Sequence, residues 1–231
     1  MNSRKKLCLA LDFSTGTEAI EWVGQTSDVF GVYKVGLELF CAEGPHFIDR
    51  VRSAGADEIF LDLKLHDIPR TVERAIRRLG TLGVDYLTIH SGGGPAMLKA
   101  AAEAAASVGI RPLAVTVLTS LNQADLEAIG CGKAPIEVVI DRARLCVMNG
   151  VSGLVCSAQE TLGLRAALTE DAFLVTPGIR LGRDDTGDQK RVCTPAQALE
   201  NGSSMLVIGR AVTGANNSEA ALAALNAAIA P

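Results

Sequence analysis

Eight short apolar runs recur along the chain at intervals of roughly 20 to 35 residues, and this repeat limits the possible folds most strongly. The stretches between the runs carry the periodicity of amphipathic helices, so the pattern predicts repeated βα units around a parallel sheet. The expected strands are Leu7–Asp12, Val32–Gly36, Glu58–Leu63, Tyr86–His90, Leu113–Leu118, Gly153–Ser157, Phe173–Pro177 and Met205–Gly209.

The segment after Pro69 shows helical spacing most clearly. Its apolar stripe at i, i+3, i+4 and i+7 consists of Val72, Ala75, Ile76 and Leu79. The alanine-rich segments Pro95–Ser107 and Asn217–Ala230 are further predicted helices, because alanine has the highest helix propensity.

Eight βα units can close into a barrel or form an open doubly wound sheet. The number of strands and the length of 231 residues favour closure. No long linker or low-complexity tract divides the chain. We therefore expect an α/β fold in which residues 1–231 form a single (β/α)8 TIM barrel domain.

Composition narrows the class of partner. A net charge of −4 and a pI near 5.4 leave no basic excess for binding nucleic acid or an anionic membrane. The six cysteines form no C-x-x-C pair and the three histidines lack metal-ligand spacing, which indicates reduced thiols and no metal site. The apolar stretch near the N-terminus is interrupted by Asp12, so it is too short for a signal sequence. We expect a cytoplasmic protein that acts on a small molecule.

Two charges end the third run. Side chains alternate between the faces of a strand, so Asp62 and Lys64 share one side. Barrel enzymes keep their sites at the carboxyl ends of the strands, where such charges can perform chemistry, although a structural ion pair is the alternative. Asp67 falls outside the alternation, just before Pro69, so its carboxylate can point elsewhere.

The loop Leu181–Arg191 after the seventh run is long for a compact domain. Phosphate sites of such barrels are frequently built from the loops after strands 7 and 8. The Arg210 guanidinium, the Gln189 amide and the backbone N–H of Gly209 therefore suggest a phosphate clamp. An ordinary surface loop is the alternative.

Several motifs follow one another in a specific order and spacing. They are Leu9-Ala-Leu-Asp12, Tyr33-Lys34-Val-Gly, Asp62-Leu-Lys-Leu-His-Asp67-Ile-Pro, Leu118-Thr119-Ser120, Thr176-Pro-Gly-Ile-Arg180, Asp188-Gln189 and Ile208-Gly209-Arg210. Together, from about Leu7 to Gly214, they resemble the orotidine 5′-phosphate decarboxylase family. The resemblance implies a homodimeric decarboxylase that converts orotidine 5′-monophosphate to uridine 5′-monophosphate and CO2 without a cofactor.

The resemblance also implies a role for each matching residue. Asp62 and Lys64, with Asp67 of the partner subunit, would surround C6 of the orotate ring, and Lys64 would deliver the proton. The substrate-binding residues that it implies are Asp12, Lys34 and Thr71 at the ribose, Ile68 near them, Thr119 and Ser120 at the pyrimidine edge, and Pro177, Arg180, Gln189, Gly209 and Arg210 at the phosphate.

Physical reasoning supports this assignment. Loss of CO2 from such a ring carbon leaves a localised electron pair, and no thiamine, pyridoxal or metal motif is visible in the sequence to absorb it. Fixed charge must then stabilise the carbanion. An ammonium already held by carboxylates needs little reorganisation when negative charge develops.

Two other functions compete. A metal-assisted sugar-phosphate lyase or decarboxylase of the same barrel superfamily shares an Asp-x-Lys-x-x-Asp pattern and requires Mg²⁺. The His-Asp-Ile-Pro and Thr-Pro-Gly-Ile-Arg segments point away from it. The other alternative is a non-catalytic barrel that senses UMP, and the presence of Lys64 argues against it.

Overall fold

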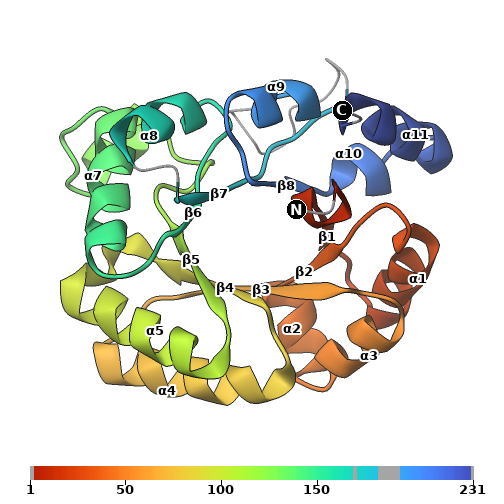
Figure 1. The fold of residues 1–231 in the computed structure, drawn as a ribbon, viewed down its shortest axis with the longest axis horizontal. Coiled ribbons are helices and arrows are strands. Elements are labelled where there is room, and N and C mark those ends of the chain that lie inside the picture. The colour runs from red at the N-terminus through yellow and green to blue at the C-terminus, as the bar shows by residue number, and fades with distance from the viewer. Residues whose placement is uncertain (1–2, 169–170, 182–192, 230–231) are drawn as a thin grey trace.

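The structure is a computed structural model that describes residues 3–168, 171–181 and 193–229, and its strands form one closed parallel barrel. The strands follow one another in chain order, and the last pairs with the first (Figure 1). They are β1 (Leu7–Leu11), β2 (Val32–Gly36), β3 (Glu58–Leu65), β4 (Tyr86–His90), β5 (Arg111–Val115), β6 (Gly153–Val155), β7 (Phe173–Thr176) and β8 (Met205–Ile208). The predicted (β/α)8 barrel is confirmed.

Helices surround the barrel on its outer side (Figure 1). They are α1 (Gly16–Thr26), α2 (Leu37–Glu43), α3 (Phe47–Ser53), α4 (Pro69–Leu79), α5 (Gly94–Val108), α6 (Gln123–Ala128), α7 (Pro135–Met148), α8 (Thr161–Ala167), α9 (Pro195–Glu200), α10 (Arg210–Thr213) and α11 (Ser218–Ile229), with the short 3-10 helices η1 (Ser3–Lys6), η2 (Gly80–Leu82) and η3 (Ser91–Gly93). The three helices predicted from sequence correspond to α4, α5 and α11. Within the described ranges, no helix is long and apolar enough to span a membrane.

Both faces of the strands are apolar, because one face meets the helices and the other fills the barrel. In β1, Leu7, Leu9 and Leu11 pack into the large cluster that includes the helices. Cys8 and Ala10 belong to the second cluster, which fills the barrel interior. This interior cluster contains Cys8, Ala10, Val32, Phe60, Tyr86, Leu113, Val175, Met205 and Val207.

The fifth strand ends earlier than predicted. It was expected over Leu113–Leu118, whereas β5 pairs with β4 only from Arg111 to Val115. The next residue turns toward β6, since the N–H and the hydroxyl of Thr116 both donate to the Val155 carbonyl, at 3.2 and 2.9 Å. The residues after Val115 therefore lie in a loop at the mouth of the barrel.

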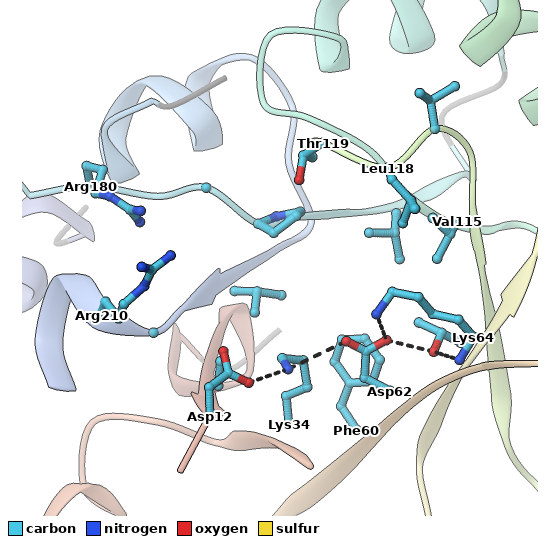
Figure 2. Close-up of a pocket in the computed structure, with 18 residues that line it drawn as sticks. Asp12, Lys34, Phe60, Asp62, Lys64, Val115, Leu118, Thr119, Arg180 and Arg210 are labelled. Carbon is cyan, nitrogen blue, oxygen red and sulfur yellow. Dashed lines mark hydrogen bonds and ion pairs between the residues drawn. The ribbon is translucent and has the colours of Figure 1, made fainter. Parts of the chain in front are cut away.

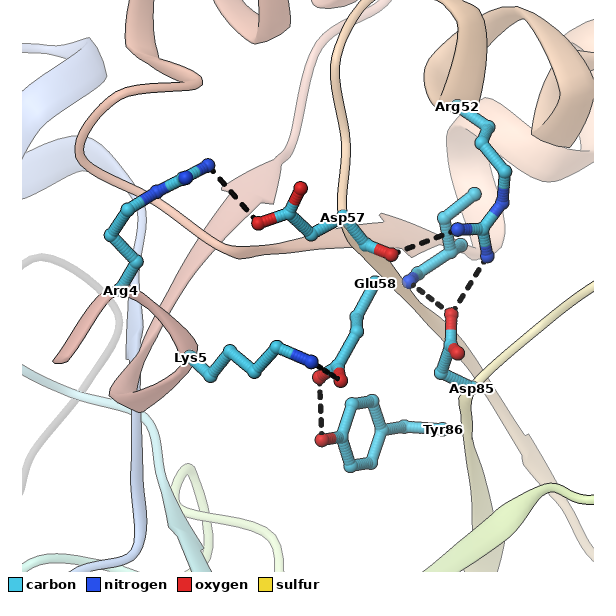
Figure 3. Close-up of polar contacts among 8 residues, drawn as sticks. Arg4, Lys5, Arg52, Asp57, Glu58, Asp85 and Tyr86 are labelled. Carbon is cyan, nitrogen blue, oxygen red and sulfur yellow. Dashed lines mark hydrogen bonds and ion pairs between the residues drawn. The ribbon is translucent and has the colours of Figure 1, made fainter. Parts of the chain in front are cut away.

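Polar contacts close the amino-terminal end of the barrel (Figure 3). Lys5 from η1 forms an ion pair with Glu58, and the Tyr86 hydroxyl donates to the other Glu58 oxygen at 2.8 Å. Burial and the adjacent Glu58 carboxylate raise the pKa of Tyr86, which keeps its hydroxyl protonated as a donor. The open mouth therefore lies at the opposite, carboxyl end of the strands.

At this closed end, Asp85→Ala is expected to destabilise the barrel. Asp85 Oδ2 accepts the backbone N–H of the buried Ile59 and an N–H of Arg52, both at 2.8 Å. Loss of the acceptor leaves the Ile59 N–H unpaired, which should lower the free energy of unfolding by about 1–3 kcal/mol in urea titrations. Asp28→Ala removes an exposed carboxylate and should change it by less than about 0.5 kcal/mol. Equal effects of both substitutions would contradict this account.

Candidate active site

The carboxyl ends of the strands surround a cavity of about 220 Å³ (Figure 2). Its lining combines charged and polar side chains with apolar ones from several strands. The lining residues are Ala10, Asp12, Lys34, Phe60, Asp62, Lys64, Thr88, Val115, Val117, Leu118, Thr119, Val155, Pro177, Gly178, Arg180, Val207, Gly209 and Arg210.

Four charged side chains in the cavity alternate in sign, and we call Asp12, Lys34, Asp62 and Lys64 the charge array (Figure 2). Lys34 Nζ lies 2.9 Å from Asp12 Oδ1 and 3.5 Å from Asp62 Oδ2. Lys64 Nζ lies 2.9 Å from Asp62 Oδ1. Each ammonium therefore has a carboxylate beside it, and the formal charges of the array sum to zero.

Strand register brings Lys34 into the cavity. It lies beside Ala10 of β1 and Phe60 of β3, two residues that also line the cavity. Burial alone would lower the pKa of Lys34, but the carboxylates of Asp62 and Asp12 outweigh it and raise the pKa. The Lys34 ammonium therefore stays charged although its side chain is only 11% exposed.

Asp62 is the central member of the charge array. Burial alone would raise its pKa, but the ammonium groups of Lys34 and Lys64 and hydrogen bonds from Lys64 and Thr88 hold the pKa below its usual value. Asp62 is therefore ionised at neutral pH, and its position between two cations is electrostatically favourable.

The end of β3 is less regular than simple alternation predicts. Pairing with β4 shifts between Leu61 and Leu65, and Lys64 has a φ of 49°. Asp62 and Lys64 nevertheless both reach the cavity, as the sequence predicted. The irregularity therefore lies within the segment of β3 that carries both charges.

Two guanidinium groups lie at the other side of the cavity from Lys64 (Figure 2). Arg180 follows β7, and Arg210 follows Gly209 at the end of β8. Both side chains line the cavity, together with Pro177. Guanidinium groups bind the oxygens of phosphate through paired hydrogen bonds, so this side of the cavity suits a phosphate group.

An apolar wall completes the cavity near Lys64. Val115 and Leu118 lie above the lysine side chain, and Val155 and Phe60 also line the space (Figure 2). Apolar walls keep water out and lower the local dielectric, which strengthens every charge interaction inside.

The predicted site residues that the structure describes fall into two groups. The cavity lining brings together Asp12, Lys34, Asp62, Lys64, Thr119, Pro177, Arg180, Gly209 and Arg210. The lining does not include the exposed residues Asp67, Ile68, Thr71 and Ser120. Asp67 Oδ1 accepts the N–H of Ile68 at 2.6 Å, and Ile68 is 67% exposed. Gln189 lies outside the described residues.

Sequence reasoning missed Thr88, which lines the cavity from β4. Its signal in the sequence was a polar residue in the middle of the apolar run Tyr86–His90, two residues before the predicted strand end. Residues on one strand face recur every second position, so Thr88 shares the inward face of Tyr86. That inward placement could have identified it.

His66 and His90 stack beside the charge array, with their ring centroids 4.9 Å apart. Burial, followed by the nearby charges of His66, Arg142 and Lys64, lowers the pKa of His90. The N–H of Gly92 donates to His90 Nδ1 at 3.2 Å, which requires that nitrogen to be unprotonated. His90 is therefore a neutral, hydrogen-bonded residue at neutral pH. In the part of the chain that the structure describes, no three His, Cys, Asp or Glu side chains gather as a metal site.

Comparison with known proteins identifies the family. The sequence model of the "Orotidine 5'-phosphate decarboxylase / HUMPS family" matches residues 5–225. The chain belongs to this family. It is 44% identical over 229 residues to an orotidine 5′-phosphate decarboxylase of Anaeromyxobacter sp. (strain K), covering 99% of this chain and 100% of the relative. The corresponding Neisseria meningitidis serogroup A protein is 45% identical over 226 residues, covering 96% of this chain and 92% of the relative.

Solved structures agree with this assignment. The orotidine 5′-phosphate decarboxylase of Lactobacillus acidophilus superposes with a TM-score of 0.84 at 32% identity, covering 98% of this chain and 100% of that one. An uncharacterized conserved protein of Geobacillus kaustophilus superposes with a TM-score of 0.83 at 31% identity, covering 97% of this chain and 100% of that one. The barrel is therefore shared along almost its full length.

The charge array predicts that Lys34→Met raises the pKa of Asp62, because the substitution removes one of its two neighbouring cations. Carboxyl ¹³C NMR of the ligand-free protein measures this pKa. Lys133→Met, which removes an exposed ammonium beside Asp141, should leave the pKa of Asp62 unchanged. Because the pKa of Asp62 is lower in the folded protein than its value of about 3.9 in the unfolded chain, the ionised carboxylate stabilises the fold at neutral pH. That stabilisation is lost in acid, below about pH 4, as the pH falls through the pKa of the folded state. An Asp62 titration that Lys34→Met leaves unaltered would contradict the array.

Proposed function

We propose that the chain decarboxylates orotidine 5′-monophosphate to uridine 5′-monophosphate and CO2, the last step of de novo pyrimidine nucleotide synthesis, without a cofactor. The observation that carries this proposal is the charge array ending at Lys64 in a cavity whose opposite side holds two arginines. Membership of the family and 44% identity to a named decarboxylase over the length of the chain support it.

The reaction needs an electrostatic partner for a carbanion. As the bond between C6 and the carboxylate breaks, its electron pair stays on C6 and CO2 leaves. Lys64 Nζ then donates a proton to C6 and is reprotonated from solvent. Because Asp62 already holds the Lys64 ammonium at 2.9 Å, little reorganisation is needed when negative charge appears on the ring.

The remaining cavity residues would bind the parts of the nucleotide that do not react. Asp12 and Lys34 would hold the ribose hydroxyls, and Thr119 and Ser120 the pyrimidine edge. Binding energy from a remote phosphate can be used to orient the ring and exclude water. The residues proposed for the phosphate are Pro177, Arg180, Gln189, Gly209 and Arg210.

A homodimer would complete the site. Asp67, Ile68 and Thr71 are exposed just after the strand that carries Lys64, and they do not line the cavity of their own chain. Ile68 is 67% exposed on this edge, so it is available for contact with another surface. We infer that a second copy covers it, that Asp67 of each chain joins the charge array of the other, and that Ile68 and Thr71 contribute to the same shared site.

The compartment is proposed on the chemistry of the thiols. All six cysteines are free, including the exposed Cys41 and the half-buried Cys131 and Cys193. Accessible thiols persist in the reducing cytoplasm, where we place the protein.

Purified protein is expected to consume orotidine 5′-monophosphate in a spectroscopic assay and to keep that activity in EDTA. Lys64→Ala removes both the proton donor and the nearest cation, so kcat should fall by about 10³-fold or more. Lys133→Ala, a surface substitution, should leave kcat unchanged. Activity that EDTA abolishes and Mg²⁺ restores would instead favour the metal-assisted sugar-phosphate lyase, and UMP binding without turnover would favour a sensor.

Mixing two inactive variants tests the shared site. In a Lys64→Ala/Asp67→Ala heterodimer, one site would keep Lys64 of one chain and Asp67 of the other. Equal mixtures should therefore regain about one quarter of wild-type activity after subunit exchange, since half the dimers are mixed and each has one intact site. Native mass spectrometry confirms the exchange. Mixed dimers without activity would show that Asp67 acts within its own chain.

A further inference from the structure

Thr88 forms hydrogen bonds with two members of the charge array, Lys64 and Asp62. Its hydroxyl accepts the backbone N–H of Lys64 at 2.8 Å and donates to Asp62 Oδ1 at 2.8 Å. The same Asp62 oxygen accepts Lys64 Nζ at 2.9 Å. The three residues therefore form a closed ring of hydrogen bonds, with Thr88 only 1% exposed.

Donor and acceptor counting fixes the direction of each bond in this ring. A backbone N–H can only donate, and an ionised carboxylate can only accept. The Thr88 hydroxyl has one proton, so it must accept from Lys64 and give its proton to Asp62. No hydroxyl rotation satisfies both neighbours in another way, which makes the bridge directional.

The backbone at Lys64 explains why such a bridge is needed. Among the residues that the structure describes, Lys64 is the only non-glycine residue with a positive φ, 49°, a conformation that side chains with a Cβ adopt at some cost. The β3–β4 ladder pairs Leu61 with Leu87 and next pairs Leu65 with Ile89. Within that gap the Thr88 hydroxyl supplies the acceptor for the Lys64 N–H.

We propose that Thr88 is a positioning residue that fixes the Lys64 ammonium and the Asp62 carboxylate relative to each other for proton delivery. The inference rests on the proposed decarboxylation and extends it to a residue that does not itself transfer the proton. Thr88 acts through two contacts, one on the backbone that carries Lys64 and one on the carboxylate that orients its ammonium.

The side chain's chemistry predicts which substitutions preserve this role. Serine keeps the hydroxyl and loses only a methyl group, so Thr88→Ser retains the bridge. Valine has the shape of threonine without the hydroxyl, so Thr88→Val leaves the Lys64 N–H without this acceptor and frees the Asp62 carboxylate to rotate toward Lys34, 3.5 Å away. A partly buried donor that loses its partner carries a free-energy cost, so the local geometry should change.

Steady-state kinetics on orotidine 5′-monophosphate test the proposal. Thr88→Val should lower kcat by about 10- to 100-fold, the equivalent of one lost hydrogen bond to a charged group, with KM within about threefold of wild type. Thr88→Ser should stay within about threefold in kcat. Wild-type kcat in Thr88→Val, or equal losses in the serine and valine variants, would overturn the proposal.

Thr116→Val is the matched control. Thr116 is also a buried threonine near the mouth, but its hydroxyl donates to the Val155 carbonyl and it does not line the cavity. The kcat of Thr116→Val should stay near that of the wild type. A loss of kcat equal to that of Thr88→Val would show a general packing effect and would overturn the proposal. If Thr88→Val does not fold, Thr88→Ala is compared with Thr88→Ser instead. A larger loss of kcat in the alanine variant would then support the proposal, and equal losses would overturn it.

NMR of the ligand-free protein separates this inference from the proposed function. In Thr88→Val the Lys64 amide resonance should shift and the pKa of Asp62 should rise, because the lost hydrogen bond favoured the ionised form. Unchanged resonances and titration would overturn the positioning role even in an active enzyme. A wild-type chain with no decarboxylase activity would overturn the proposed function, while these two readouts would still decide whether Thr88 positions Lys64.

Discussion

The Asp62 carboxylate is the interaction on which the site depends. It contacts Lys34 at 3.5 Å and Lys64 at 2.9 Å, and without it two ammonium groups would share a partly buried cavity with only Asp12 to offset them. Burying an unpaired charge is strongly unfavourable, so the carboxylate makes the site compatible with the fold as well as with chemistry. Its lowered pKa means that this compensation persists at neutral pH and fails only in acid.

The barrel separates stability from chemistry along its axis. At the amino-terminal end, contacts such as the Tyr86–Glu58 hydrogen bond at 2.8 Å tie neighbouring strands together, and the apolar interior cluster fills the middle. At the carboxyl end, parallel strands end side by side, so Lys34 of β2 and Asp62 of β3 meet although they are far apart in sequence. The packed interior and the amino-terminal end of the barrel therefore support charges at the mouth that local structure alone could not hold together.

Local patterns predicted the parts of this arrangement that depend on local rules. Apolar runs predicted the eight strands, and alternation placed Asp62 and Lys64 on one face. The register shift opposite Thr88 was not predictable in this way, because it depends on pairing between two strands. The same reason explains the early end of β5, where Thr116 bonds to the carbonyl of Val155 on the next strand. The role that we propose for Asp67 depends on a second chain, so neither periodicity nor the geometry of one chain decides it.

The neutrality of the charge array separates binding from catalysis. Two carboxylates and two ammonium groups offer little net attraction to an anionic nucleotide, whereas the guanidinium groups of Arg180 and Arg210 on the other side of the cavity can bind phosphate oxygens through paired hydrogen bonds. Substrate affinity would then come mainly from the arginine side, and the array would interact strongly only when negative charge develops near Lys64. An interaction that is stronger in the transition state than in the ground state accelerates the chemical step. Thr88 fits this division because it binds no part of the nucleotide in our proposal and acts only on the geometry of the array.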